Sequence, residues 1–176
     1  VGLRHMHRDT SITPAEQAAI KRVRALGIDT RSMSAISNVF RVANSLRNYS
    51  EQNLLKEFGL SFSGFTVLWV LWVWGPKESH SLAAESGIAK STLTGVVKTL
   101  QSLGFASKMT HPSDRRRVVV RITSSGARIM KKIFPRFNQI EVNATADLTK
   151  EEKTDLAHAL RVILHTVERQ VSRPDP

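Results

Sequence analysis

The chain has 176 residues, 41% of them hydrophobic, and 26 Lys and Arg stand against 15 Asp and Glu, giving a net charge of +11. This length and composition suffice for one domain with a core and exclude wholesale disorder. The charge indicates a polyanionic partner, most often nucleic acid and less often an anionic membrane, and the absence of cysteine excludes disulfides, thiolate metal sites and cysteine catalysis.

A membrane span is not predicted. The longest apolar stretch covers residues 65–74 and contains Thr66, whereas a spanning helix needs about 20 apolar residues. The N-terminus lacks the apolar core of a signal peptide. Together with the cysteine-free composition, which fits a reducing compartment, this predicts a cytoplasmic protein with no membrane partner.

Two helices are predicted at the start of the chain. Thr13 followed by Pro14 and Glu16 is typical of a helix start, and Gly27 ends that segment. A second helix is expected over residues 32–58. Its apolar stripe consists of Ile36, Val39, Phe40, Ala43, Leu46, Leu54, Leu55 and Phe58. At roughly 40 Å it is longer than a small domain needs, which indicates packing against a second subunit.

The third helix is predicted over residues 63–74, with Ser61 as its cap. It is apolar on every side, and although its β-branched and aromatic content would also suit a buried strand, the flanking residues favour a helix. Most of its aromatic residues are expected in the core. The alternative is that some of them line a ligand pocket, for which the candidates are Phe65, Leu68, Trp69 and Trp72.

Residues 81–103 carry a helix-turn-helix pattern. A short helix at 81–86 is followed by a turn at 87–90 that contains Gly87, and a second helix at 91–103 ends before Gly104. One face of the second helix is small or polar and free of acids, as the major groove requires. The predicted recognition residues are Lys90, Ser91, Thr92, Thr94, Gly95, Lys98 and Thr99.

A β-hairpin is predicted next, with strands at 105–110 and 118–123 and a basic loop at 111–117. A hairpin after a helix-turn-helix is a wing, and its cations suit phosphate and minor-groove contacts. Asp114 is placed to brace Arg116; the alternative is an ordinary solvated loop. The predicted wing residues are Lys108, Ser113, Asp114, Arg115, Arg116 and Arg117.

Charge is concentrated in this region. Residues 90–132 hold ten Lys or Arg and one acid, Asp114, so that +9 of the total +11 lies in a quarter of the chain. Concentrated charge is typical of a binding footprint.

Two more helices complete a mainly α prediction. One runs from Ser124 to about residue 146, where Pro135 is expected to kink it. Thr149 and Glu152 form a capping box for the last helix, over residues 150–171, whose stripe contains Leu156, Leu160, Leu164 and Val167.

This order of elements resembles the MarR family of bacterial transcriptional regulators over roughly residues 32–170. The specific marks are the residues 91–97, Leu103-Gly104-Phe105, Asp114-Arg115-Arg116 and the Val-x-Ile-Thr-x-x-Gly pattern at 120–126. The resemblance implies a winged helix-turn-helix homodimer that binds double-stranded DNA, with Arg116 in the minor groove and residues 91–103 in the major groove. It also implies release by a small anionic or phenolic aromatic effector, and no cofactor.

The resemblance implies a division of the chain into an N-terminal extension with a short helix at 1–31, dimerisation helices at 32–60 and 124–171, and a DNA-binding lobe at 61–123. The sequence departs from the family pattern at Lys98-Thr99, Lys108 and His111, where many members carry Asp-Arg, Arg and Asp. These departures affect the expected operator sequence, because Lys and Thr read other base edges than Arg does.

Three other classes of protein are alternatives to a ligand-controlled regulator. An enzyme is disfavoured, because no G-x-S-x-G or H-E-x-x-H pattern occurs and the six histidines are scattered. A metal-responsive regulator of the same fold is a weak alternative, since His158 and His165 on one helix are about 10 Å apart. A non-specific architectural DNA-binding protein is the third, and specificity for a palindrome distinguishes it from a regulator.

Overall fold

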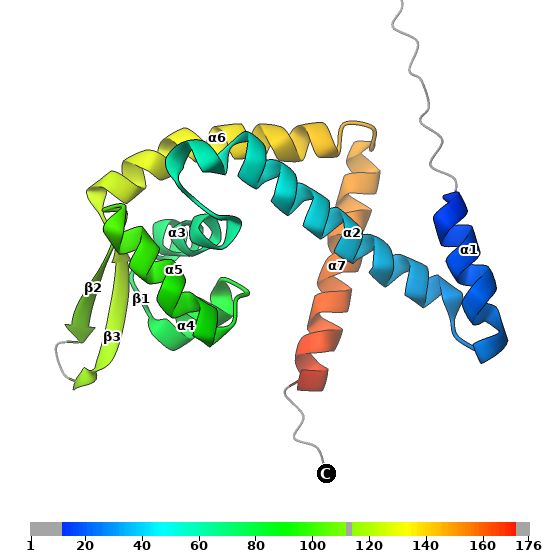
Figure 1. Cartoon of the computed structure of the whole chain (residues 1–176), viewed down its shortest axis with the longest axis horizontal. Coiled ribbons are helices and arrows are strands. Elements are labelled where there is room, and N and C mark those ends of the chain that lie inside the picture. Colours follow the sequence, from blue (N-terminus) through cyan, green and yellow to red (C-terminus); the bar gives the residue numbers. More distant parts are fainter. Residues whose placement is uncertain (1–11, 112–113, 172–176) are drawn as a thin grey trace, which may run out of the picture. The chain divides into compact units, whose positions relative to one another are not determined.

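The structure is a computed structural model. It describes the backbone of residues 12–111 and 114–171, and the side chains of these residues except 110–117. The chain divides into two compact units, Val1–Tyr49 and Ser50–Pro176, and the boundary falls within one long helix. Most described residues are helical, so the predicted mainly α class is confirmed (Figure 1).

The first unit contains α1 (Pro14–Val23), the short 3-10 helix η1 (Arg24–Leu26) and most of α2 (Thr30–Asn53). The Thr13 hydroxyl accepts from the Glu16 amide at 3.2 Å, and Gly27 ends the segment with φ 67°, so both predicted boundaries are confirmed. Asp29 caps α2 by accepting hydrogen bonds from the Ser32 hydroxyl and the amides of Ser32 and Arg31, and these bonds hold the pKa of Asp29 below its usual value.

The predicted continuous helix over 32–58 is wrong at its C-terminal end. α2 ends at Asn53, Leu54 leaves the helical region with φ −141° and ψ −60°, and a 3-10 helix, η2 (Leu55–Phe58), follows. Leu54 and Leu55 are both buried. The change of direction begins the return of the chain to the end of α2, where Glu51 accepts a hydrogen bond from the Phe62 amide at 2.6 Å, so tertiary contacts rather than the local apolar pattern set the end of this helix.

The second unit is built around α3 (Phe62–Trp74), which packs against α4, α5, α6 and β3. The Ser61 hydroxyl accepts from the Gly64 amide at 3.1 Å, and Glu51 at the end of α2 accepts from the Phe62 amide at 2.6 Å. The helix prediction for this apolar segment is therefore confirmed. Its buried residues are Gly64, Phe65, Val67, Leu68, Val70 and Leu71.

A small antiparallel sheet lies beside this helix in the order β1-β3-β2. The predicted hairpin is present as β2 (Ala106–His111) and β3 (Asp114–Ile122), while the two-residue strand β1 (Lys77–Glu78) was not predicted from the sequence. The predicted loop at 111–117 is too long, because β3 begins at Asp114.

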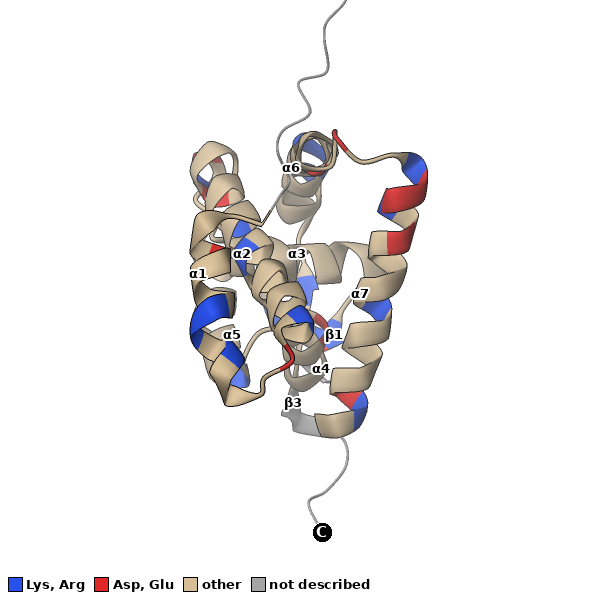
Figure 2. Ribbon diagram, turned by 90° about the vertical axis from the view of Figure 1, so that its right-hand side faces the viewer, with Lys and Arg blue, Asp and Glu red and all other residues tan. Residues whose placement is uncertain are grey.

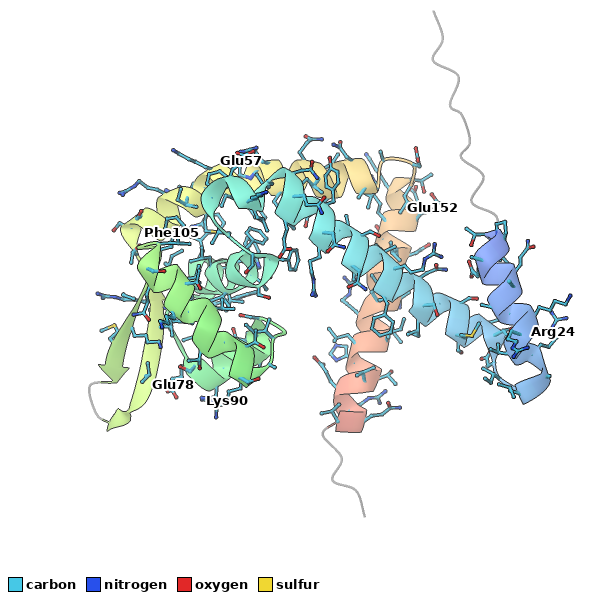
Figure 3. All side chains as sticks on the ribbon, in the orientation of Figure 1. Arg24, Glu57, Glu78, Lys90, Phe105 and Glu152 are labelled. Atoms are coloured by element: carbon cyan, nitrogen blue, oxygen red, sulfur yellow. The ribbon has the colours of Figure 1, made fainter. Side chains whose placement is uncertain are left out.

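The last two helices are α6 (Ser124–Ala144), which contains Pro135, and α7 (Lys150–Val171). The predicted capping box of α7 is confirmed, since Thr149 N donates to Glu152 Oε2 at 2.7 Å and Glu152 N donates to Thr149 Oγ1 at 3.2 Å. On α6, Arg136 donates two hydrogen bonds to Glu57 of η2, both at 2.7 Å (Figure 3).

Candidate nucleic-acid interface

The helix-turn-helix consists of α4 (Ser79–Glu85) and α5 (Lys90–Ser102). Gly87 takes φ 63° in the turn between them, a conformation that side chains with a Cβ rarely adopt. Leu82 of α4 and Leu93, Val97 and Leu100 of α5 are buried in the common core. This packing fixes the opposite side of α5 toward solvent.

All seven predicted recognition residues are exposed. By helical geometry Ser91, Gly95 and Lys98 lie farthest from the buried stripe, so they form the outer face of α5. This face carries small or polar groups and one cation, Lys98. Figure 2 colours the Lys and Arg residues of the whole chain blue. The chemistry fits contact with base edges and phosphates in the major groove.

Thr92 and Thr99 lie on one flank of α5 and, with Gly95, line a cavity of about 410 Å³ beside Gly59–Ser61 and Gly64. The Thr99 hydroxyl also donates to the Gly95 carbonyl at 3.2 Å. These two threonines are thus shared between the outer surface and the groove toward α3, and they face DNA less directly than Ser91 and Lys98 do.

Two exposed polar residues of α5 were missed by the sequence prediction. Ser102 lies on the side away from the core and follows Lys98 by four residues, whereas Gln101 lies on a flank of the helix. That helical spacing was a usable signal. The Ser102 hydroxyl donates to the Thr99 carbonyl at 2.8 Å, so it is already satisfied within the helix.

The hairpin supplies the second part of the interface. Lys108 is exposed on β2 and pairs in register with Val120 of β3. Asp114, Arg115, Arg116 and Arg117 form the start of β3, but their side chains lie outside the described residues, as does the whole of Ser113. The predicted bracing of Arg116 by Asp114 therefore remains a prediction.

The motif residues between Leu103 and Gly126 join α5 to α6. Thr123 N donates to the Phe105 carbonyl at 3.0 Å, and the Thr123 hydroxyl donates to the Gly104 carbonyl at 2.7 Å while accepting from the Gly126 amide at 3.0 Å. A Cβ at Gly126 would lie 2.2 Å from the Phe105 oxygen. This part of the motif is a structural junction rather than a DNA contact.

The four candidates for a ligand pocket differ in burial. Phe65 and Leu68 are buried in the core, whereas Trp69 and Trp72 are partly exposed. Trp69 stacks on Phe134 of α6 with ring centroids 4.5 Å apart and planes 15° apart. None of the four lines either of the two cavities described in this unit. Phe134 was missed because the pairing of α3 with α6 is not visible in the sequence.

Neither a membrane span nor a metal cluster occurs among the described residues. Within the described ranges, no helix is long and apolar enough to cross a membrane. Over the same ranges, no group of three or more His, Cys, Asp or Glu side chains is arranged to hold a metal ion. His158 and His165 are exposed on α7, and His165 Nδ1 lies 3.6 Å from Glu168 Oε2.

The fold and this surface define a winged helix-turn-helix protein. Residues 60–118 match the model of the MarR family. The uncharacterised helix-turn-helix regulator YwaE of Bacillus subtilis is 33% identical over 91% of this chain and 97% of its own length. This chain therefore belongs to the MarR family of transcriptional regulators, as its residues predicted.

Two further relatives are informative. The transcriptional repressor NicR of Pseudomonas putida is 27% identical over 59% of this chain and 66% of its own. A structure of Bordetella bronchiseptica BpsR, whose DNA binding is regulated by 6-hydroxynicotinic acid, superposes with a TM-score of 0.68 over 74% of this chain and 98% of its own, at 22% identity. At that identity the likeness shows the fold alone.

Proposed function

We propose that this regulator is a homodimeric repressor that binds a pseudo-palindromic operator through α5 and the hairpin and is released by a small aromatic or anionic acid. The observation that carries the proposal is the outer face of α5, which is exposed, small or polar, free of acids and positioned beside a basic hairpin. Such a face fits the major groove while the hairpin contacts the adjacent backbone or minor groove.

The contact residues proposed are those of the two elements. On α5, Ser91, Thr94 and Lys98 read base edges, and Lys90 at the helix start contacts phosphate. On the hairpin, Lys108 and residues 113–117 contribute phosphate and minor-groove contacts. Repression follows when a bound dimer covers DNA that polymerase needs.

A second copy is proposed to cover apolar faces that the chain leaves exposed. None of the 22 residues of α7 is buried, although the helix carries Leu156, Leu160, Leu164 and Val167. In the first unit, Phe40 of α2 is 65% exposed, and Ile36 and Val39 beside it are also exposed. Obligate interfaces commonly bury upwards of about 2,000 Å², and long apolar helix faces supply such area. The dimerisation helices are thus residues 32–60 and 124–171, and 61–123 is the DNA-binding lobe.

The effector is proposed to act on the aromatic cluster formed by Trp69, Trp72, Trp74 and Phe134. Planar aromatic acids match these ring faces. The regulator itself is proposed to be non-catalytic and, because its proposed target is chromosomal DNA, to act in the cytoplasm with the nucleoid.

Selection of random DNA tests this proposal. The purified protein is expected to enrich a pseudo-palindrome of roughly 16–20 base pairs with half-sites about one helical turn apart. Its affinity for the enriched site is expected to fall with salt at a log–log slope of about −0.9 per neutralised phosphate. If no sequence is enriched and all random duplexes bind with equal affinity, the protein is instead an architectural DNA-binding protein.

A further inference from the structure

A second basic surface lies on α6. Arg128, Lys131 and Lys132 are all exposed, and by helical spacing they lie opposite the buried residues Met130 and Ile133. Among the described residues, none of these three cations makes a salt bridge or a side-chain hydrogen bond. The first acid of α6 is Glu141, so the N-terminal half of this helix carries uncompensated positive charge.

This basic α6 face lies far from the candidate DNA interface. α6 begins where Thr123 bonds to Gly104 and Phe105, just beyond the C-terminal end of α5. The nine residues of β3 span roughly 26 Å from this junction to the free end of the hairpin. Figure 3 labels Lys90 and Phe105 at opposite ends of α5, with Lys90 on the side toward which the hairpin extends. Lys90 and the free end of the hairpin therefore lie toward the end of α5 that is remote from the start of α6.

The basic α6 face is unfavourable for the helix that carries it. Arg128 is three residues from Lys131 and four from Lys132, and like charges at these spacings destabilise a helix by a few tenths of a kcal/mol. A stability argument does not account for these residues, whereas a polyanionic partner does.

The composition of the basic α6 face distinguishes between two kinds of polyanionic partner, an acidic protein and DNA. Besides the three cations it presents Ser124 and Pro135 and no large apolar side chain. A protein interface has a core enriched in aromatic and apolar residues, which is lacking here. Contacts from Lys and Arg alone are typical of sequence-independent binding to the DNA backbone.

We propose that the basic α6 face binds a second DNA duplex through its phosphates while α5 holds the operator, so that one dimer bridges two segments of DNA. The proposal rests on operator binding through α5. It adds a function that the helix-turn-helix does not provide, namely the bringing together of separate DNA segments.

A two-duplex capture experiment tests the bridge. Biotinylated operator duplex on beads is saturated with the full-length protein and washed, and a fluorescent random-sequence duplex of the same length is then added at about 50–200 mM salt. The wild-type protein is expected to retain the second duplex, and less of it as salt rises. The triple variant R128Q/K131Q/K132Q is expected to retain at most about one tenth as much of the second duplex, while its occupancy of the operator stays unchanged.

The matched control is K21Q/R22Q/R24Q, which removes three exposed cations of α1 and η1 and changes the net charge equally. It is expected to capture the second duplex as the wild type does. Failure of the wild type to capture it while occupying the operator overturns the bridge, and so does equal loss in both variants. Lower operator occupancy in the α6 variant also overturns it, because the face then belongs to the operator interface. Absence of operator binding by the wild type contradicts the proposed function instead.

Discussion

Among the described glycines, Gly126 has the least room for a side chain. Its missing Cβ makes space for the Phe105 carbonyl, which lies 2.2 Å from where that atom would stand, and backbone cannot rotate away as a flexible side chain does. The junction between α5 and α6 therefore depends on glycine at this position, and the Thr123 hydrogen bonds hold the same two segments together.

Replacing Gly126 by alanine is expected to lower the free energy of unfolding by about 1–3 kcal/mol, because the junction must open to admit the methyl group. Urea denaturation measures this. Gly95→Ala is the matched control, since nothing lies within 4 Å of its Cβ position and alanine favours a helix by roughly 0.5–1 kcal/mol. Equal stability of the two variants would show that the close approach at Gly126 is absent.

Lys98 is the cation on the outer face of α5, and Lys98→Ala is expected to change base preference by about 1–3 kcal/mol at one position of each half-site. Competition between single-base variants of the operator measures the change. Arg116→Ala is expected to weaken binding to all of these operator variants alike. The reason is that a wing contact adds interactions with the phosphates and with the width of the minor groove. The assignment of α5 as the reader fails if the two variants give the same sequence-independent loss.

At the level of elements, Glu57 and Arg136 connect the end of the α2–η2 segment to α6. Arg136 donates both hydrogen bonds at 2.7 Å and lies 5.9 Å from the Phe58 ring centroid. These hydrogen bonds hold the pKa of Glu57 below its usual value of 4.5, and they raise the pKa of Arg136. The pair is exposed, so solvent screening keeps its contribution to stability small.

The pH dependence of this pair has a definite sign. Because the pKa of Glu57 is lower in the folded protein, its contribution is fully present above the unfolded value of about 4.5 and is lost as pH falls through the lower folded value. The wild type is expected to be more stable than Glu57→Gln near neutral pH, and the difference should vanish in acid. Denaturation midpoints of both proteins across that range measure it, with Glu151→Gln on α7 as an exposed control. A difference that persists at the lowest pH contradicts the assignment.

The helices and the hairpin were predictable because their signals are local. Thr13, Ser61 and the Thr149–Glu152 box occupy the predicted cap positions, and α7 has the predicted bounds. The break at Leu54 was not predictable, because it follows from the return of the chain to α3 and from a core that the sequence does not reveal. β1 was missed because two residues carry no periodicity, and it exists only by pairing with β3.

The candidate interface was predictable to the same extent. A helical period separates the exposed from the buried side of α5, so the seven residues could be named in advance. The sequence could not show that Thr92 and Thr99 also border a groove toward α3, nor that Trp69 stacks on Phe134, because both depend on contacts between distant segments.

For the whole molecule, the uncovered stripe of α7 makes a dimer the expected state. Sedimentation at low micromolar concentration should give about twice 19.6 kDa. The double variant L156E/L160E places carboxylates on the stripe and is expected to sediment as a monomer and to lose operator binding, because burying unpaired charge is costly. His158→Glu, on the opposite side of the same helix, is the control and should remain dimeric. A wild-type monomer at this concentration excludes the dimer.

The proposed ligand control requires coupling between the aromatic cluster and the spacing of the two recognition helices in the proposed dimer. α3 packs against both α5 and α6, and the Trp69–Phe134 stack joins α3 to α6, so a ligand that separates these rings displaces elements attached to the DNA-binding face. A ligand shifts the equilibrium only if it prefers the spacing that does not fit DNA. A preference of about 1–3 kcal/mol, or roughly 5- to 150-fold in operator affinity, suffices for regulation.

Salicylate-like aromatic acids are therefore expected to quench tryptophan fluorescence and to weaken operator binding over the same concentration range. All three tryptophans lie at 69–74, so the signal reports binding at the cluster. Phe134→Ala removes the stacking partner and should abolish both effects, whereas Phe62→Ala, which alters the separate contact between Phe62 and Phe137, should leave both in place. Quenching without loss of operator affinity contradicts the coupling, because the ligand then binds both spacings equally. If no acid in a broad panel of aromatic acids causes either effect, the regulator is controlled by its own abundance.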